Sequence, residues 1–199
     1  MKTETHELTR GHGLIEPMLA RLRARKANQL IPPALRQGRI LDIGCGSYPY
    51  FLSHTSFRGK FAIDQLKASG LPVDISFHEY NLNASTPLPF EDEYFSALTM
   101  LAVVEHLNPA VLVELFRETH RILRPDGILV LTTPAAWTGR LLKRMARLNL
   151  VSKEEIDEHV FAYTLPLLGW YFGAGGFPLE RVHFGFFEGG LNLWATARR

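Results

Sequence analysis

Short β-rich segments alternate with helical patterns along most of this 199-residue chain, and this alternation limits the folds open to it. A strand followed by a helix and then by another strand favours a parallel sheet with helices on both faces. The clearest helical pattern, 110–123, ends at the turn-forming run Arg124-Pro125-Asp126-Gly127. The runs predicted as strands are 39–43, 60–63, 75–80, 95–100 and 127–132.

The C-terminal segment departs from this alternation. Residues 179–187 and 191–197 are both β-rich, and Glu188-Gly189-Gly190 separates them as a turn would, which predicts an antiparallel hairpin. The sequence therefore predicts an α/β fold with a seven-stranded, mostly parallel sheet, helices on both faces and a C-terminal antiparallel hairpin. No repeat or composition break divides the chain, so we expect one domain over residues 1–199.

Composition excludes several classes of protein. Hydrophobic residues make up 46% and charged residues 21%, which excludes a disordered or fibrous chain. The net charge of +2 does not indicate a nucleic-acid binder. The single cysteine excludes an internal disulfide framework and fits a reducing compartment. Residues 1–13 carry no apolar signal core, and prolines and glycines interrupt the uncharged stretch 160–179, so we expect a soluble, cytoplasmic protein.

The first predicted strand runs directly into Gly44-Cys45-Gly46. Glycines at this strand end let a ligand approach the backbone, because no Cβ stands in the way, and open α/β sheets bind their ligands at this edge. Asp64 ends the second strand, where a carboxylate can accept both hydroxyls of a ribose. Two glycines alone are compatible with a tight turn, but together with Asp64 they predict a nucleoside site.

The residues around the glycines indicate which nucleoside. Ser47-Tyr48-Pro49-Tyr50 lacks the third small residue of a dinucleotide loop, which opposes an NAD-dependent oxidoreductase. Asp42 adds negative charge beside the ligand, which repels phosphates and favours a cation. A nucleoside with a positive sulfonium and an amino-acid tail satisfies both conditions.

The motifs, taken in order, resemble those of the class I S-adenosylmethionine-dependent methyltransferases of the small-molecule, type 11-like group, over about residues 35–135. The resemblance rests on the segments Asp42–Gly46, Pro87–Phe95, Leu101–Leu107 and Arg121–Gly127. It implies a Rossmann-like fold, with S-adenosylmethionine as methyl donor and S-adenosylhomocysteine as product. The chain departs from the family's pattern at Tyr48, where a third glycine is common, and at Asn81, where an acidic residue usually faces the adenine. The cofactor-binding residues that the resemblance implies are Asp42, Gly44, Cys45, Gly46, Asp64, Gln65, Asn81, Leu82 and Leu101.

His106 is the candidate catalytic residue. It follows the fourth strand, where by analogy with the family a general base would take the proton of an oxygen or nitrogen acceptor. The alternative is that His106 caps or packs at the start of the next helix, and Glu105 is interpreted as structural. No metal site is predicted, because the His-Glu-x-x-His spacing is absent.

The rest of the chain is expected to hold the methyl acceptor. We expect an N-terminal helical cap at 1–34 and a helical insertion at 135–178 over the active site. Glu155, His159 and Tyr163 recur at four-residue spacing and predict a substrate-facing polar patch, or plain helix polarity. The acceptor is expected to be a small molecule or a lipid- or glycan-linked group. A nucleic acid is not expected, because 101–104 lacks a Pro-Pro-Tyr-type loop.

Two basic clusters leave the partners open. They favour weak peripheral contact with an anionic membrane or with an acidic acceptor, or are ordinary solvated helix faces. The oligomeric state is not predicted. A catalytically silent, S-adenosylmethionine-binding partner subunit is the alternative function. The clusters are Arg140, Lys143, Arg144 and Arg147, and Arg21, Arg23, Arg25 and Lys26.

Overall fold

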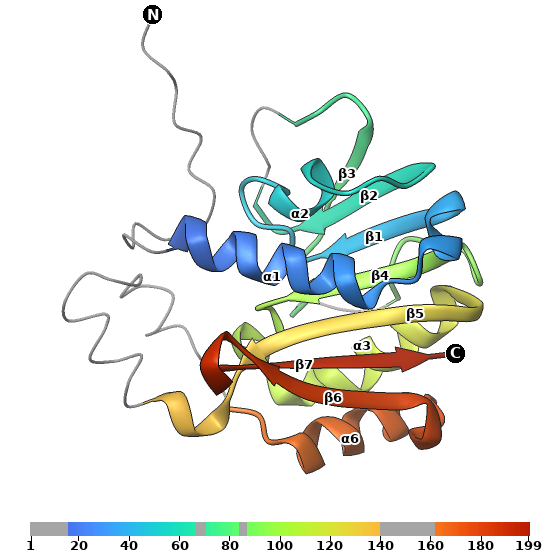
Figure 1. The fold of residues 1–199 in the computed structure, drawn as a ribbon. Helices are drawn as coiled ribbons and strands as arrows, with labels where there is room; N and C mark the ends of the chain where they lie inside the picture. The colour runs from blue at the N-terminus through green and yellow to red at the C-terminus, as the bar shows by residue number, and fades with distance from the viewer. Residues whose placement is uncertain (1–15, 67–70, 84–86, 140–161) are drawn as a thin grey trace, which may run out of the picture.

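The computed structural model describes residues 16–66, 71–83, 87–139 and 162–199. Its strands form one seven-stranded sheet in the order β3-β2-β1-β4-β5-β7-β6 (Figure 1). The first five strands are parallel, and β7 is antiparallel to its neighbours β5 and β6, which confirms the predicted fold class and hairpin. The strands are β1 (Arg39–Ile43), β2 (Gly59–Asp64), β3 (Ile75–Glu79), β4 (Phe95–Leu101), β5 (Leu123–Pro134), β6 (Val182–Phe187) and β7 (Asn192–Arg198).

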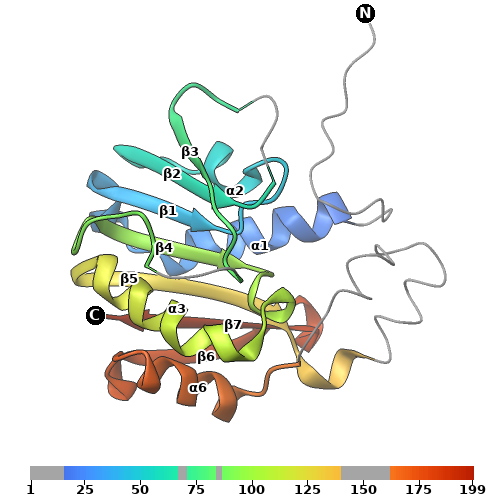
Figure 2. The same cartoon turned by 180° about the vertical axis from the view of Figure 1, so that it is seen from behind.

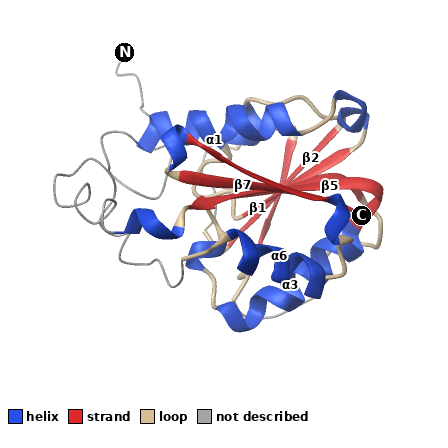
Figure 3. Cartoon of the chain, turned by 60° about the horizontal axis from the view of Figure 1, so that its bottom comes forward, coloured by secondary structure: helices blue, strands red, loops and turns tan. Residues whose placement is uncertain are grey.

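Helices cover both faces of the sheet (Figures 2 and 3). The helix α1 (Glu16–Leu30) and the short α2 (Tyr50–Ser53) lie on one face, and α3 (Pro109–Ile122) and α6 (Leu165–Ala174) lie on the other. Neighbouring side chains of a strand point to opposite faces, so the central strands supply both cores. The α1 side includes Ala24, Ala27, Ile31, Ile40 and Val130, and the α3 side includes Leu41, Ile43, Leu98, Phe116 and Phe172.

The ends of α3 follow from its sequence. The Asn108 side chain accepts a hydrogen bond from the backbone N–H of Ala110 (3.0 Å), and Pro109 suits the first turn, where no N–H partner is needed. The strand β5 begins directly at Leu123, four residues earlier than predicted. Leu123 pairs with Phe95 of β4 before the register shifts, so the expected turn is instead an irregular start to β5, with Asp126 at φ 59°.

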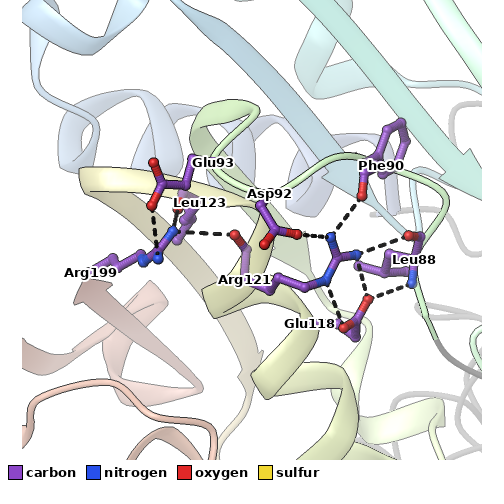
Figure 4. Close-up of polar contacts among 8 residues, drawn as sticks. All are labelled: Leu88, Phe90, Asp92, Glu93, Glu118, Arg121, Leu123 and Arg199. Carbon is purple, nitrogen blue, oxygen red and sulfur yellow. Dashed lines mark hydrogen bonds and ion pairs between the residues drawn. The ribbon is translucent and has the colours of Figure 1, made fainter.

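The loop that leads into β4 is held by Arg121 (Figure 4). Its guanidinium donates to both Glu118 carboxylate oxygens (2.9 and 2.7 Å) and to Asp92 Oδ1 (2.7 Å). It also donates to the carbonyl oxygens of Leu88 (3.1 Å) and Phe90 (2.9 Å). Glu118 in turn accepts from the Leu88 N–H (2.7 Å), so α3 fixes the loop that leads into β4.

Parts of the predicted cap and insertion fall within the described residues. The cap contributes α1, and the insertion contributes the 3-10 turn Ala136–Thr138 and α6, which packs on α3 through Phe116 and Phe172 (ring centroids 4.8 Å apart). No helix among the described residues combines the length and apolar character that a bilayer crossing requires. The predicted residues Arg140, Lys143, Arg144, Arg147, Glu155 and His159 lie outside the described residues.

Candidate active site

The loop after β1 presents open backbone at the carboxyl edge of the sheet. Gly44 and Gly46 both adopt left-handed conformations (φ 74° and 72°). A Cβ on Gly44 would lie 2.6 Å from Val103 Cγ2, so packing also requires glycine there. Nothing lies within 4 Å of the place that a Cβ on Gly46 would take, and half-buried Cys45 lies between the two glycines. A nucleoside ligand needs such an open backbone, so the loop fits the predicted site.

Asp64 organises this loop from the end of β2. Its side chain is buried, its Oδ2 accepts from the Gly46 N–H (2.9 Å), and its Oδ1 accepts from the Leu66 N–H (2.9 Å). Gln65, the next residue, is exposed. The carboxylate predicted to meet a ribose therefore also sets the shape of the glycine loop.

Asp42 is a second buried carboxyl group at this edge. The Thr99 hydroxyl of β4 donates to its Oδ1 (2.6 Å). Burial raises the pKa of Asp42 to about 7; the Thr99 hydrogen bond lowers this pKa, and the charge of Asp64 raises it. Desolvation therefore keeps part of the Asp42 population protonated at neutral pH, and the negative charge expected from the sequence is present in the rest.

The loop after β3 is joined to the segment after β4. Asn81 is exposed and its Oδ1 accepts from the Asn83 N–H (2.9 Å), while Leu82 packs half-buried on the core. Asn83 Oδ1 accepts from the Asn108 N–H (2.9 Å). Since β3 and β4 flank β1 and β2, this bond connects the two sides of the carboxyl edge.

His106 follows a sharp turn at the end of β4. Leu101 ends the strand half-buried, and Ala102 takes the left-handed conformation (φ 58°) while its N–H donates to the Thr132 carbonyl (2.9 Å). His106 ends the 3-10 turn Val104–His106, with its Nδ1 atom buried. Asn108 supplies the cap of α3, so the interpretation of His106 as that cap is wrong.

The comparisons with known proteins agree with this geometry. The family model described as "Methyltransferase domain" matches residues 15–182. The chain belongs to this methyltransferase family. A comparison with curated proteins gives no match.

Solved structures share the methyltransferase fold. One is an S-adenosylmethionine-dependent methyltransferase from Mesorhizobium loti (17% identity, TM-score 0.66, covering 91% of this chain and 100% of that chain). Another, from Thermotoga maritima, is described as a possible histamine N-methyltransferase (16% identity, TM-score 0.66, covering 91% of this chain and 89% of that chain). A third is an S-adenosylmethionine-dependent methyltransferase from Archaeoglobus fulgidus (15% identity, TM-score 0.64, covering 91% of this chain and 94% of that chain). At these identities the likeness shows the fold.

Beside His106, this methyltransferase carries a buried polar group. Glu105 is 2% exposed, and its Oε2 accepts from the Thr133 hydroxyl of β5 (3.0 Å), which fits its structural interpretation. Tyr163 is fully buried, and its pKa is raised by burial first, then by Tyr171 and by the charge of Glu105. Tyr163 forms an isolated parallel β-bridge with Ala135 and belongs to no helix. The predicted helical stripe of Glu155, His159 and Tyr163 therefore does not extend to Tyr163.

The buried Asp42 should make the stability of the methyltransferase depend on pH. The unfolded chain releases this proton near the ordinary value of 3.8, whereas the folded chain holds it up to about 7. Between these values the unfolded state binds fewer protons, so the free energy of unfolding falls as pH rises, by at most about 1.4 kcal/mol per unit. Asp42→Asn keeps an acceptor for Thr99 but cannot ionise, so it should flatten this slope.

Thermal unfolding at several pH values between about 4.5 and 8 checks this expectation. Asp74→Asn is the matched control, because Asp74 is exposed and its ion pair with Lys60 lowers its pKa, which places its titration below this range. The same slope in the parent and in Asp42→Asn would contradict the assignment.

Proposed function

We propose that the chain is an S-adenosylmethionine-dependent methyltransferase whose acceptor is a small molecule or a lipid- or glycan-linked group, acting in the cytoplasm. The open glycine loop, held by Asp64 at the carboxyl edge of a methyltransferase-family sheet, carries this proposal. The cofactor supplies a methyl group that its sulfonium has already activated. The protein's part is therefore alignment of the acceptor and, for oxygen or nitrogen acceptors, removal of a proton.

The charge at the carboxyl edge supports a cationic nucleoside. Asp42 and Asp64 both lie buried beside the glycine loop. A nearby positive charge favours the ionised form of Asp42, whereas a phosphate would meet two carboxyl groups and gain nothing from them. Asp64 would hold the ribose, Asn81 and Leu82 the adenine, and the segment from Asp42 to Gly46 the amino-acid tail.

His106 supports the proton-transfer step. It lies on the segment that leaves β4, next to the glycine loop through the contact of Val103 with Gly44. Its Nδ1 atom is buried. An imidazole side chain can take a proton from an oxygen or nitrogen acceptor at neutral pH.

Calorimetric titration tests cofactor binding. We expect S-adenosylmethionine and S-adenosylhomocysteine to bind in the micromolar range, about −8 kcal/mol, and NAD not to bind. Binding of NAD without binding of either nucleoside would overturn the proposal. A transfer assay with tritium-labelled methyl donor over a fractionated cell extract then separates an enzyme from a catalytically silent cofactor-binding subunit, which would bind the cofactor and transfer nothing.

Asp64→Ala should weaken binding of S-adenosylhomocysteine by about 1.5–3 kcal/mol, roughly 10- to 150-fold, because charge-assisted hydrogen bonds are lost. Asp64→Asn should weaken binding of S-adenosylhomocysteine less than Asp64→Ala does, since one acceptor oxygen remains. Asp74→Ala, which removes an exposed carboxylate just before β3, is the control and should bind like the parent. Titration of all three variants decides; if Asp64→Ala also binds like the parent, Asp64 does not hold the ribose.

A further inference from the structure

The turn between β6 and β7 lies at the same edge of the sheet as the glycine loop. Asn192 pairs with Pro134, the last residue of β5, and with Phe187, the last residue of β6. The turn Glu188–Gly190 therefore lies beyond the carboxyl end of β5. Since neighbouring strands are about 4.8 Å apart, β7 is two strand spacings, about 10 Å, from β4, which leads to His106.

The backbone of this turn is unusual at Glu188. Three successive residues adopt positive φ angles: Glu188 (53°), Gly189 (65°) and Gly190 (90°). Glycine enters this region freely, whereas a residue with a Cβ is strained there. Such strain outside glycine gathers at functional sites, and here it directs attention to the Glu188 side chain.

The Glu188 carboxyl group is held at one oxygen. The Asn192 side-chain amide donates to Oε2. The other oxygen, Oε1, is buried, and nothing in the described part of the chain donates to it. Burial raises the pKa of Glu188, while Arg23 of α1 and the Asn192 hydrogen bond lower it. A buried carboxyl oxygen without a donor is costly, so this atom calls for a hydrogen-bond donor from elsewhere.

An exposed aromatic ring lies beside the same turn. Trp137, in the 3-10 turn after β5, is 61% exposed, and its Cζ2 atom lies 3.8 Å from the place that a Cβ on Gly190 would take. By contrast, Trp194 of β7 is covered by the Lys26 ammonium of α1, 5.1 Å from the ring centroid. The turn thus combines a buried hydrogen-bond acceptor with an open, flat apolar surface.

We propose that Glu188 is a specificity-determining residue that accepts a hydrogen bond from an N–H or O–H group of the methyl acceptor, while Trp137 contacts a flat apolar part of that molecule. The chemical class is an amine or alcohol on an aromatic or similarly flat group. This inference rests on the proposed function, because it assigns the substrate side of that site.

Three small probes test it: benzylamine, benzyl alcohol and benzyl methyl ether. All three carry the same ring, but only the first two have a donor. Each is titrated by ligand-detected NMR against the full chain saturated with S-adenosylhomocysteine. We expect the two donor probes to bind at about 1 mM, a reasonable strength for about eight heavy atoms, and the ether to bind at least tenfold more weakly.

Variants then assign the effect to Glu188. Glu188→Ala should weaken both donor probes at least tenfold, and Asn192→Ala should weaken them by removing the group that holds the carboxylate. Glu180→Ala, which removes an exposed carboxylate at the other end of β6, should bind them like the parent. Retained affinity for S-adenosylhomocysteine shows that each variant is folded.

The outcomes are distinct. Equal binding of the ether and the donor probes, no binding of either donor probe, or equal binding by the parent and Glu188→Ala each overturns the role of Glu188. If the parent does not bind S-adenosylhomocysteine, the proposed function fails, and this inference fails with it. If the parent binds S-adenosylhomocysteine but no donor probe, only the inference about Glu188 fails.

Discussion

Replacing His106 with alanine should lower the turnover of methyl transfer by about 10²- to 10⁴-fold and leave cofactor affinity nearly unchanged. The imidazole is the group that would take the proton of the acceptor, and its removal should not disturb α3, because Asn108 caps that helix. The measurement is kcat with an oxygen or nitrogen acceptor from the extract screen, together with calorimetric titration of S-adenosylmethionine.

The choice of acceptor matters for this test, because a carbon or sulfur nucleophile can react without a general base. His183→Ala removes an exposed histidine of β6 and should keep the parent's turnover. If His106→Ala transfers the methyl group to such an oxygen or nitrogen acceptor as fast as the parent does, His106 has a packing role only.

Arg121→Met should lower the free energy of unfolding by about 2–4 kcal/mol. The Glu118 side chain is only 9% exposed and would keep its charge without its cation, and two backbone carbonyls would lose their donor. Unfolding in urea measures the loss. Adding Glu118→Gln should recover part of it, because the uncompensated charge is then gone.

Arg117→Met is the matched control on the same helix. Arg117 and its partner Glu114 are largely exposed, so this substitution should cost less than about 1 kcal/mol. Equal losses for the two arginine variants would show that Arg121 does not hold the loop before β4.

The strands and the glycine loop could be predicted because their signals are local. Strand periodicity and turn residues lie within a few positions of one another, and Gly44, Gly46 and Asp64 occupy strand ends that the pattern already marks. The first residue of β5 cannot be predicted from the sequence, because the pairing of Leu123 with Phe95, and not a local signal, extends that strand.

The remaining site residues depend on pairings that no local pattern contains. Thr99 reaches Asp42 only because β4 lies beside β1 in the matching register. The charge of Asp42 depends on burial, which the sequence alone does not reveal. The sequence places Glu188 only in a turn, since its φ angle and its hydrogen bond with Asn192 arise from the hairpin's three-dimensional form.

The position of β7 has a consequence for how the molecule folds. β7 is the last strand along the chain, yet it lies between β5 and β6 inside the sheet. Until it inserts, β5 has an open edge. Contacts between distant parts of a chain form slowly, so this insertion is expected late in folding. The glycine loop and Asp64 lie at the ends of β1 and β2, the first strands along the chain, so the proposed cofactor side can assemble before the hairpin that carries Glu188 and Asn192 docks on β5.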